Sequence, residues 1–445
     1  MLRGFQRRRQ RREIPLPRGE AYSLDQESVV RRPAWWRFFG PAFIISIGYF
    51  DPGNWATDLQ AGSQFGYTLL WVLSLSCLIG ALVQNLCSKL GIATGKDLAQ
   101  HCAERFPPWA AKILFVSAVL SMMATDLAEI IGVAVALHLL FAIPLWMGAI
   151  ITAVDVFLIL LLNRWSFRAI ETVFLTFLTS VSLMYVIELF MSDPDYEAVV
   201  RDSVLPSADI MDASALFIAV GIIGATIMPH NLYLHSNLAI SRVRENLAKP
   251  RTLYRWSLWD TNISLTFAWF VNAAILVVAA AVFNPIYMKT GTVIASFDDA
   301  YKTLVPILSQ GAGLIFAIAL LVAGVASSTS ATLAGQVVFE GFLKMPNVSP
   351  FLIRVGTRTV TMAPALIAIF LNAPPVEILV WSQVVLSLQL PFAMLPLVIF
   401  TDDKKTMGDF ANRAWIRLLL WPVTVILLIL NLVVLGQTIG WIPSG

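Results

Sequence analysis

Three side chains that can bind a metal ion stand inside long apolar stretches of this sequence. Asp51 and Asn54 carry carboxylate and amide oxygens on either side of a Pro-Gly pair, and Met228 carries a thioether next to a proline. A proline interrupts the hydrogen bonds of a helix, which releases backbone carbonyls such as that of Ala225 as further ligands. Because sulfur is a soft ligand, this mixed set suits a transition-metal dication better than magnesium or calcium.

Asp126, Glu129 and Arg358 form a second set of polar residues in apolar sequence. Residues three apart share one face of a helix, and repulsion between two neighbouring carboxylates favours a proton on one of them. The acidic pair therefore suits proton movement. A simpler role as the partners of Arg358 is the alternative, and the two roles are compatible. His230 and His235 lie about 140° apart around a helix, which excludes a same-face zinc pair, and we interpret His235 as structural.

The composition identifies the chain as a membrane protein. Hydrophobic residues make up 58% of its 445 residues and charged residues 13%, against about 45–50% and about 25% in soluble domains. The mean hydropathy is +0.74. These values disfavour a soluble enzyme, a nucleic-acid-binding protein and a disordered protein. The three cysteines form no Cys-x-x-Cys pair, so neither a disulfide framework nor a zinc knuckle is implied.

Apolar stretches bounded by charges or turn residues predict eleven transmembrane helices. They cover residues 38–66, 69–93, 110–141, 145–163, 168–191, 213–241, 254–283, 308–340, 352–371, 376–400 and 415–438. Of the 31 Lys and Arg residues, 27 fall in loops or helix ends on one side of the membrane and 3 on the other, and the remaining one, Arg358, lies within the ninth predicted helix. Because cytoplasmic loops collect Lys and Arg, we expect a basic cytoplasmic tail at 1–37 and a C-terminus outside.

The first and the sixth predicted helices each contain a break, at Asp51–Asn54 and at Met228–His230. Irregular backbone at membrane depth is tolerated only where it is buried in protein or lines a cavity. Two broken helices at matching places in halves of opposite orientation are typical of an inverted-repeat transporter with a midplane site. We therefore expect an all-α fold in which residues 38–191 and 213–400 form five-plus-five inverted repeats and 415–438 adds one C-terminal helix.

Simpler structural roles compete with a metal site at these breaks. Asp51 could serve only as the N-cap of the half-helix that follows it, and a methionine in a membrane helix usually fills space. A carboxylate at membrane depth is, however, costly and usually functional. We therefore favour the interpretation in which Asp51, Asn54 and Met228 meet as ligands.

The chain resembles the Nramp family of proton-coupled divalent-metal transporters. The similarity rests on Asp51-Pro52-Gly53-Asn54 and on Ala225-Thr226-Ile227-Met228-Pro229-His230-Asn231, with further matches at Asp126-Leu127-Ala128-Glu129, Ala334-Gly335-Gln336, Thr357-Arg358 and Gln389-Leu390-Pro391-Phe392. These motifs follow the family's order over nearly the whole chain. The family's fold is similar to that of the sodium-coupled amino-acid transporters, which are built as a five-plus-five inverted repeat.

The resemblance implies specific roles for these residues. The metal would be bound by Asp51, Asn54, Met228 and the carbonyl of Ala225, with Gln389 joining as the site closes. Gln383 lies on the same predicted helix as Gln389 and remains an alternative, and the carbonyl of Gly48 is a further candidate. The proton pathway would include Asp51, Asp126, Glu129, His230 and Arg358. No cofactor is expected beyond the transported ions.

The resemblance also narrows the substrate. Family members that carry magnesium depart from the pattern at the methionine, so the retention of Met228 favours Mn²⁺ or Fe²⁺, and Cd²⁺ and Co²⁺ are expected to enter as well. Two alternatives stay open: a same-fold ion-coupled transporter of an organic substrate such as an amino acid, and an Nramp-related magnesium transporter. No H-E-x-x-H, G-x-S-x-G or ATP-binding loop indicates an enzyme. We expect a monomer in a bacterial inner membrane.

Overall fold

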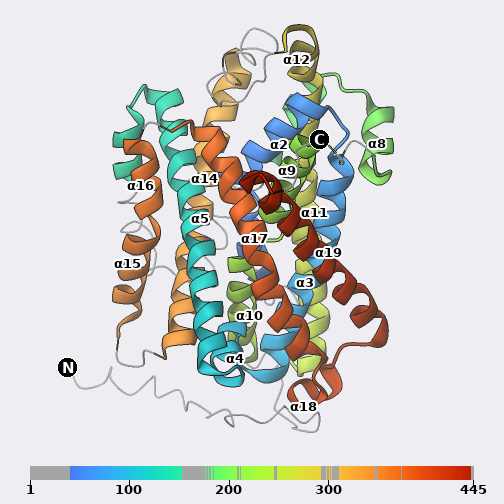
Figure 1. Ribbon diagram of the computed structural model, residues 1–445, viewed down its shortest axis with the longest axis vertical. Helices are drawn as coiled ribbons and strands as arrows, with labels where there is room; N and C mark the ends of the chain where they lie inside the picture. The colour runs from blue at the N-terminus through green and yellow to red at the C-terminus, as the bar shows by residue number, and fades with distance from the viewer. Residues whose placement is uncertain are drawn as a thin grey trace, which may run out of the picture.

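The computed structural model describes residues 41–152, 185–207, 212–244, 248–291, 310–344, 348–371 and 373–441, with eight isolated positions between them (176, 179, 182, 183, 210, 297, 300 and 302). Every regular element in these residues is a helix, which confirms the predicted all-α class. Most of the long helices run roughly along the long axis of the molecule (Figure 1).

The bounds of the helices are, in chain order, α1 (Pro41–Gly48), α2 (Pro52–Phe65), α3 (Leu70–Thr94), α4 (Leu98–Arg105), α5 (Pro108–Phe141), α8 (Tyr196–Val204), α9 (Ala213–Thr226), α10 (Pro229–Arg244), α11 (Pro250–Val282), α12 (Asn284–Thr290), α14 (Gln310–Leu343), α15 (Pro350–Thr361), α16 (Ala363–Phe370), α17 (Pro375–Asp402), α18 (Lys404–Met407), the 3₁₀ helix η3 (Gly408–Phe410) and α19 (Ala414–Ile439).

Eight helical segments of the described chain are long and apolar enough to cross a membrane. They are Leu70–Thr94, Pro108–Phe141, Ala213–Arg244, Pro250–Thr290, Gly313–Leu343, Phe351–Phe370, Pro375–Asp402 and Ala414–Ile439, and each coincides with a predicted helix. The first predicted helix is present as the two short helices α1 and α2. Of the fourth and fifth, residues 145–152 and 185–191 are helical, and most of the remainder lies outside the described residues, as does the tail at 1–37.

The first break separates α1 from α2. Helix α2 begins at Pro52, where the missing N–H costs little because the first turn of a helix leaves its N–H groups unpaired. The carbonyl of Tyr49, inside the break, accepts a hydrogen bond of 2.9 Å from Asn272 Nδ2 on α11. At the start of α1, the N–H of Ala42 donates to Asp260 Oδ2 of α11 over 3.0 Å. Helix α11 therefore holds both ends of α1.

The second break separates α9 from α10, at Ile227 and Met228. Helix α10 begins at Pro229, and Asn231, two residues later, approaches α1. Its Nδ2 atom would lie 2.5 Å from a Cβ atom added to Gly48. A larger residue at position 48 would therefore displace the side chain of Asn231. Both predicted breaks are present, at residues 49–51 and 227–228, and the helices resume at Pro52 and Pro229.

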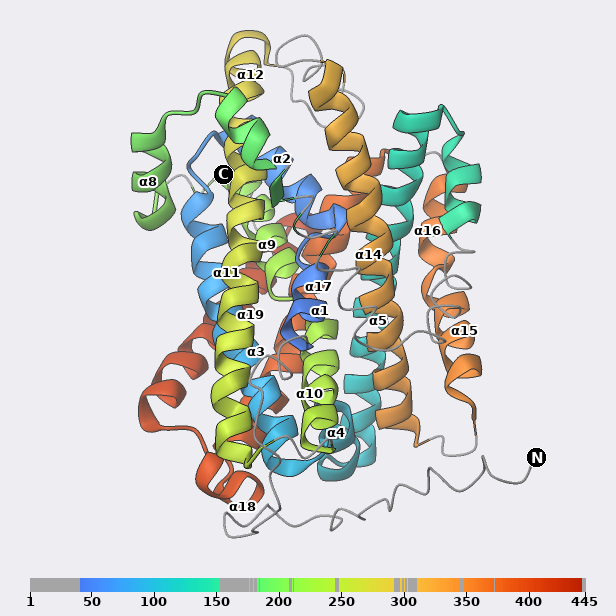
Figure 2. The same cartoon turned by 180° about the vertical axis from the view of Figure 1, so that it is seen from behind.

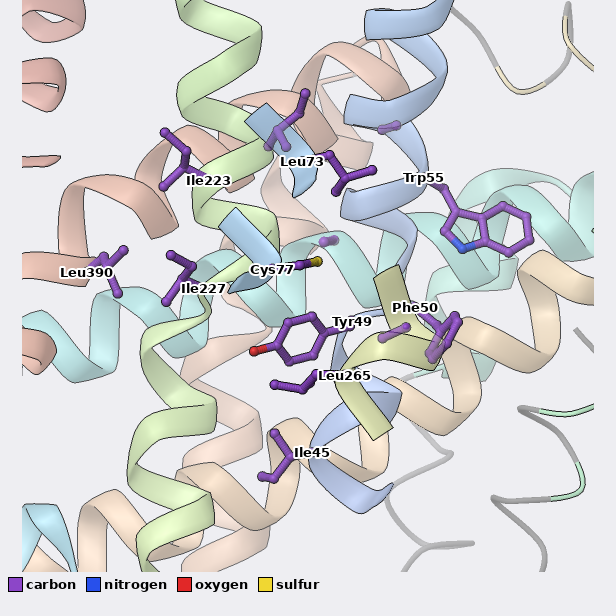
Figure 3. Packing of buried hydrophobic residues seen from close by; sticks show 14 of the residues in the cluster. Ile45, Tyr49, Phe50, Trp55, Leu73, Cys77, Ile223, Ile227, Leu265 and Leu390 are labelled. Carbon is purple, nitrogen blue, oxygen red and sulfur yellow. The ribbon is translucent and has the colours of Figure 1, made fainter. Parts of the chain in front are cut away.

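Buried apolar side chains enclose the two breaks. Figure 3 shows the Tyr49 ring close to Cys77 and Leu265, with its hydroxyl directed toward Ile227 of the second break. All four side chains are at most 6% exposed. The polar residues at the breaks therefore lie inside a packed apolar core, where an unpaired charge is costly.

The ninth predicted helix, at 352–371, is divided in the structure. Helix α15 ends at Thr361, and α16 begins at Ala363 with Pro364 in its first turn. Both views show α15 and α16 at one side of the molecule, beside α5 (Figures 1 and 2). The division leaves Arg358 in the last turn of α15, where a cation is favoured by the helix dipole.

Helix α4 lies between α3 and α5, outside every predicted helix. Its N-cap Asp97 accepts hydrogen bonds from the N–H of Gln100 and from Asn237 Nδ2 on α10, both over 2.9 Å. The N–H of Leu98 donates to Ser236 Oγ over 3.0 Å. These hydrogen bonds attach the N-terminal end of α4 to α10. Burial raises the pKa of Asp97 to about 6, although its hydrogen bonds oppose this shift.

Candidate metal and proton sites

The two breaks meet through the side chain of Asn54. Its Nδ2 atom donates a hydrogen bond of 2.6 Å to Asp51 Oδ1 and one of 3.0 Å to the carbonyl oxygen of Ala225. Asp51 and Asn54 are 1% exposed, and Ala225 is fully buried. The structure therefore brings together three of the predicted metal-binding residues, which are up to 174 positions apart in the chain.

Met228 lies at the second break, three residues after Ala225, and is fully buried. Asn231 Nδ2 lies 3.4 Å from its sulfur atom and 3.5 Å from the carbonyl oxygen of Ile45 on α1. Its thioether therefore belongs to the junction of α9, α10 and α1, and is not directed toward the lipid.

Of the two glutamines of α17, Gln383 lies beside the first break. Its Nε2 atom is 3.5 Å from Asp51 Oδ2, and a Cβ atom added to Gly53 would lie 1.7 Å from Nε2. The Oε1 atom of Gln383 is buried and has no hydrogen-bond partner. Gln389 instead accepts a hydrogen bond of 2.6 Å from Ser117 Oγ of α5. In this conformation Gln383, the alternative to Gln389, is the glutamine that lies next to Asp51.

Asp51 is also the N-cap of α2, as its simpler interpretation predicted. Its carboxylate accepts hydrogen bonds from the N–H groups of Gly53 (3.3 Å) and Asn54 (3.0 Å). The other two donors are the side-chain amides of Asn54 and Gln383. A carboxylate offers about four lone-pair positions, so all of them are occupied. None of the ion pairs in the described residues involves Asp51.

Arg358 forms an ion pair with both acids of α5. Its Nη1 atom donates to Asp126 and, over 3.1 Å, to Glu129 Oε2, and its Nη2 atom donates to Ser328 Oγ over 2.7 Å. The hydroxyl of Thr361 also donates to Asp126. Asp126, Glu129 and Arg358 are at most 3% exposed. This geometry confirms that both acids are partners of Arg358. Two carboxyl groups therefore share one positive charge.

Helix α5 also reaches the first break. Gly132 lies one turn after Glu129, and a Cβ atom added to it would stand 2.1 Å from the ring atoms Cβ and Cγ of Pro52. Pro52 follows Asp51 directly. The face of α5 that carries Glu129 is therefore in contact with the residue next to Asp51.

His230 and His235 make different contacts from α10. The Nδ1 atom of His230 is hydrogen-bonded to Thr125 Oγ1 on α5 over 3.0 Å, and that of His235 to Gln84 Oε1 on α3 over 2.9 Å. The Nε2 atoms of both rings are buried without a partner. Of these two histidines, only His230 is hydrogen-bonded to the helix that carries the two acids.

The site contains a single carboxylate next to neutral ligands. Nowhere in the part of the chain that the structure describes do three or more His, Cys, Asp or Glu side chains gather in a way that could hold a metal ion. The group around Asp51 therefore offers one negative charge and otherwise neutral amide and carbonyl groups.

Several residues that hold this site in place have no role that could be predicted from the sequence. Asp260 and Asn272 of α11 bond the backbone of α1, and Ser328 and Thr361 complete the shell of Arg358 and Asp126. Their only sequence signal was that they are polar within apolar segments. Spacing alone does not indicate which partner such a residue has.

Comparison with known proteins places most of the chain in one family. Residues 42–437 match the family model described as "Natural resistance-associated macrophage protein-like". The divalent metal cation transporter MntH of Listeria welshimeri is 44% identical over 407 residues, which cover 90% of each chain. A crystal structure of the Eremococcus coleocola manganese transporter has a TM-score of 0.81 at 34% identity and covers 95% of this chain and 92% of its own.

A more distant solved structure shares only the fold. MhsT, solved in complex with L-phenylalanine, has a TM-score of 0.58 at 14% identity, and the match covers 88% of this chain and 97% of MhsT. At this level of identity the similarity concerns the arrangement of helices and carries no information about the substrate.

Proposed function

The chain belongs to the Nramp family of divalent metal-ion transporters, and we propose that it carries Mn²⁺ or Fe²⁺ together with protons by alternating access. The proposed fold has eleven membrane helices, of which the first ten form a five-plus-five inverted repeat. The N-terminus lies in the cytoplasm and the C-terminus outside, in keeping with the distribution of Lys and Arg. The transporter acts as a monomer and needs no cofactor.

The proposal rests mainly on the position of the Asn54 amide. Its Nδ2 atom lies 2.6 Å from Asp51 Oδ1 and 3.0 Å from the carbonyl oxygen of Ala225. Two oxygen acceptors that converge on one hydrogen-bond donor can also converge on a cation that lies beside it. Gln383 presents its Nε2 atom to the same carboxylate. Rotation of each amide by about 180° exchanges nitrogen for oxygen, because amide O and NH₂ occupy nearly equivalent positions.

The proposed metal ligands follow from this exchange. Asp51 supplies the charge, Asn54 and Gln383 supply amide oxygens, Ala225 supplies a carbonyl and Met228 supplies the thioether. The unpartnered Oε1 atom of Gln383 is available for this role. Gln389 would join only in another conformation. The thioether supports Mn²⁺, Fe²⁺, Co²⁺ and Cd²⁺ over the hard ions Mg²⁺ and Ca²⁺, which argues against a magnesium transporter.

The proposed proton route runs from Asp51 along α5 to the ion-paired acids. Glu129 lies on the face of α5 that contacts Pro52, and His230 adds a buried imidazole bonded to Thr125. Because Asp126 and Glu129 share a single arginine, protonation of one acid leaves the other with a full ion pair. Protons can therefore be exchanged here while Arg358 stays paired.

Uptake of Mn²⁺ into proteoliposomes, with and without an inward proton gradient, tests the proposal. We expect the gradient to accelerate uptake. We expect Asp51→Asn to lower uptake by more than about tenfold, equivalent to about 1.4 kcal/mol, because it removes the only charged ligand. Glu197→Gln, at an exposed carboxylate of α8, serves as the control. Wild-type uptake by Asp51→Asn would contradict the assignment of the site.

The proton pathway requires a separate measurement. Glu129→Gln keeps size and hydrogen bonding but cannot ionise. We expect Mn²⁺ binding, measured by calorimetry, to persist in this variant, while proton flux measured with a pH-sensitive dye falls. Loss of metal binding with intact proton flux would show that Glu129 belongs to the metal site.

A further inference from the structure

A cavity of about 660 Å³ lies where the C-terminal parts of α5 and α16 approach the N-terminal end of α17. These three helix ends lie near one another in Figure 1. All eleven described residues that line the cavity are apolar, and none of them belongs to α2 or α9. The cavity is therefore separate from the two helix breaks, and its lining suits an apolar ligand better than water.

One wall of this cavity belongs to a closely packed unit. Ile130 and Ala134 of α5 form a buried apolar cluster with Ala149 and with Ala365 of α16. A Cβ atom added to Gly148 would lie 2.8 Å from the Cα atom of Ala134, so the segment after α5 is in backbone contact with α5. Among the described residues, α17 contributes nothing to this cluster. The cavity therefore lies at the seam between this unit and α17.

The cavity opens at the surface of the molecule between aromatic side chains. Trp146 and Phe370 line it and are 51% and 75% exposed. The candidate membrane spans that end at Phe141 and Phe370, and the one that begins at Pro375, contribute to its walls. An exposed apolar surface on such spans is a contact surface for lipid. Because tryptophan concentrates at the membrane–water interface, we expect the lipid headgroups at the level of Trp146.

The cavity extends from this level toward the middle of the membrane. Ile131 lines it and lies ten residues before the end of α5 at Phe141, which is about 15 Å along the helix axis. This depth is about half of a hydrocarbon core of about 30 Å. A slender apolar ligand that enters beside Trp146 can therefore reach Ile131, and an acyl chain of the surrounding lipid has this shape.

We propose that this cavity binds one acyl chain of a membrane phospholipid, with the headgroup beside Trp146 and the chain end near Ile131 and Ile378. The inference goes beyond the proposed transport function and does not depend on which ion is carried. An empty cavity leaves its lining without contacts on one side. The bound chain supplies those contacts and stabilises the packing of α17 against the unit formed by α5, Ala149 and α16.

The bound chain would contact both helices that carry the proposed sites. On α5, Ile131 precedes Gly132, whose Cα position is in close contact with Pro52. On α17, Ile378 precedes the proposed ligand Gln383 by five residues. The lipid therefore supports the relative position of the two helices without taking part in metal binding.

Photo-crosslinking of the purified protein tests this site. The probe is a phospholipid with a diazirine near the end of one acyl chain. We expect label on peptides that contain Ile131 or Ile378, and an excess of unlabelled phospholipid should lower it at least about threefold. Ile378→Trp fills the cavity and should lower the labelling of the α5 peptide by a similar factor. Leu78→Trp, at a position 71% exposed on α3, is the control. Labelling spread evenly over the exposed apolar helix faces, and unchanged in Ile378→Trp, would overturn the proposal.

Thermal unfolding provides a second measurement, with a variant that fills the cavity from its other side. A ligand that binds only the folded state stabilises it. We therefore expect phospholipid to raise the thermal midpoint of the delipidated wild type by a few degrees. Ala373→Trp should gain clearly less, because its indole occupies the space of the acyl chain, and Leu78→Trp should gain as much as the wild type. An equal gain in all three proteins would show that the lipid stabilises the protein from elsewhere and would overturn the proposal.

Discussion

The ring of Pro52 packs directly against Gly132, so that the first residue of α2 rests on α5. A Cβ atom at Gly132 would stand 2.1 Å from two carbon atoms of the ring, and a Cβ atom at Gly324 of α14 would lie 3.5 Å from the same ring. Three helices thus meet at the residue that follows Asp51. The position of the carboxylate depends on how closely α2 can approach α5.

Gly132→Ala is therefore expected to impair both folding and transport. Overpacking of a tight contact costs about 1–3 kcal/mol, and the displacement moves Asp51 away from its partners. We expect the thermal midpoint of the purified protein to fall by a few degrees and Mn²⁺ uptake to fall by at least about tenfold. Gly356→Ala, where the added atom meets nothing within 4 Å, should leave both unchanged. Wild-type uptake and stability of Gly132→Ala would disprove the tight contact.

The two glutamines of α17 form a matched pair for testing the metal ligands. Gln383→Ala should weaken Mn²⁺ binding by about tenfold, because it removes an amide beside Asp51. Gln389→Ala loses a hydrogen bond to Ser117, worth about 0.5–1.5 kcal/mol of stability, with no change in affinity. Calorimetric titration of both variants decides between them. If only Gln389→Ala bound Mn²⁺ more weakly, the metal ligand would be Gln389, as the resemblance to the family implied.

These glutamines illustrate what the sequence could and could not predict. Proline and a carboxylate inside apolar segments predicted both helix breaks and thus Asp51, Asn54, Ala225 and Met228. Gln383 and Gln389 stand six residues apart, about 120° around a helix. Which of the two faces Asp51 therefore depends on how α17 is rotated about its axis. That rotation is set by the packing of Gln383 against Gly224 of α9, a long-range contact that sequence spacing does not contain.

Helices α4 and α16 show the same limit in the fold. Helix α4 has eight residues and is too short and too polar to register as a membrane span. The division between α15 and α16 escaped prediction although Pro364 is visible in the sequence. Proline fits the first turn of a helix as well as it breaks one, so its presence does not decide whether the chain bends.

Asp97 gives the protein a stability that depends on pH. Burial raises its pKa to about 6 from a usual 3.8, so the folded state holds the proton more tightly than the unfolded state. Its stabilising contribution is therefore complete below about pH 4 and is lost as pH rises through 6. Asp97→Asn keeps an acceptor for Gln100 and does not titrate. It should gain stability relative to wild type between pH 4 and pH 8, by at most roughly 3 kcal/mol.

Asp212, the exposed N-cap of α9, provides a control because its pKa is shifted in the opposite direction to that of Asp97. The hydroxyl of Ser214 and the N–H of Ala215 lower the pKa of Asp212, so its contribution is present at neutral pH and lost on acidification. Asp212→Asn should therefore lose stability relative to wild type as pH rises. Thermal unfolding of wild type and both variants across this range provides the measurement. The same trend in both variants would contradict the assigned pKa shifts.

The last prediction concerns Met228 and ion selectivity. Mg²⁺ and Ca²⁺ prefer oxygen ligands, whereas Mn²⁺, Fe²⁺, Co²⁺ and Cd²⁺ accept a thioether, so the sulfur contributes binding free energy to one class of ions only. Selectivity is a difference of affinities. If the sulfur contributes about 1.4 kcal/mol to that difference, Met228→Ala should lose about tenfold in selectivity and still transport Mn²⁺ through Asp51, Asn54 and the carbonyl of Ala225.

Competition of Mg²⁺, Ca²⁺ and Cd²⁺ against Mn²⁺ uptake measures this effect. We expect the hard ions to compete better with Met228→Ala than with wild type, and Cd²⁺ to bind more weakly. Met394→Ala is the matched control, because Met394 is equally buried on α17, and removal of a buried methionine costs about 2–5 kcal/mol of stability at either position. Only loss of a ligand, and not loss of packing, changes the order of the ions. Identical competition profiles in the two variants would assign Met228 to packing alone.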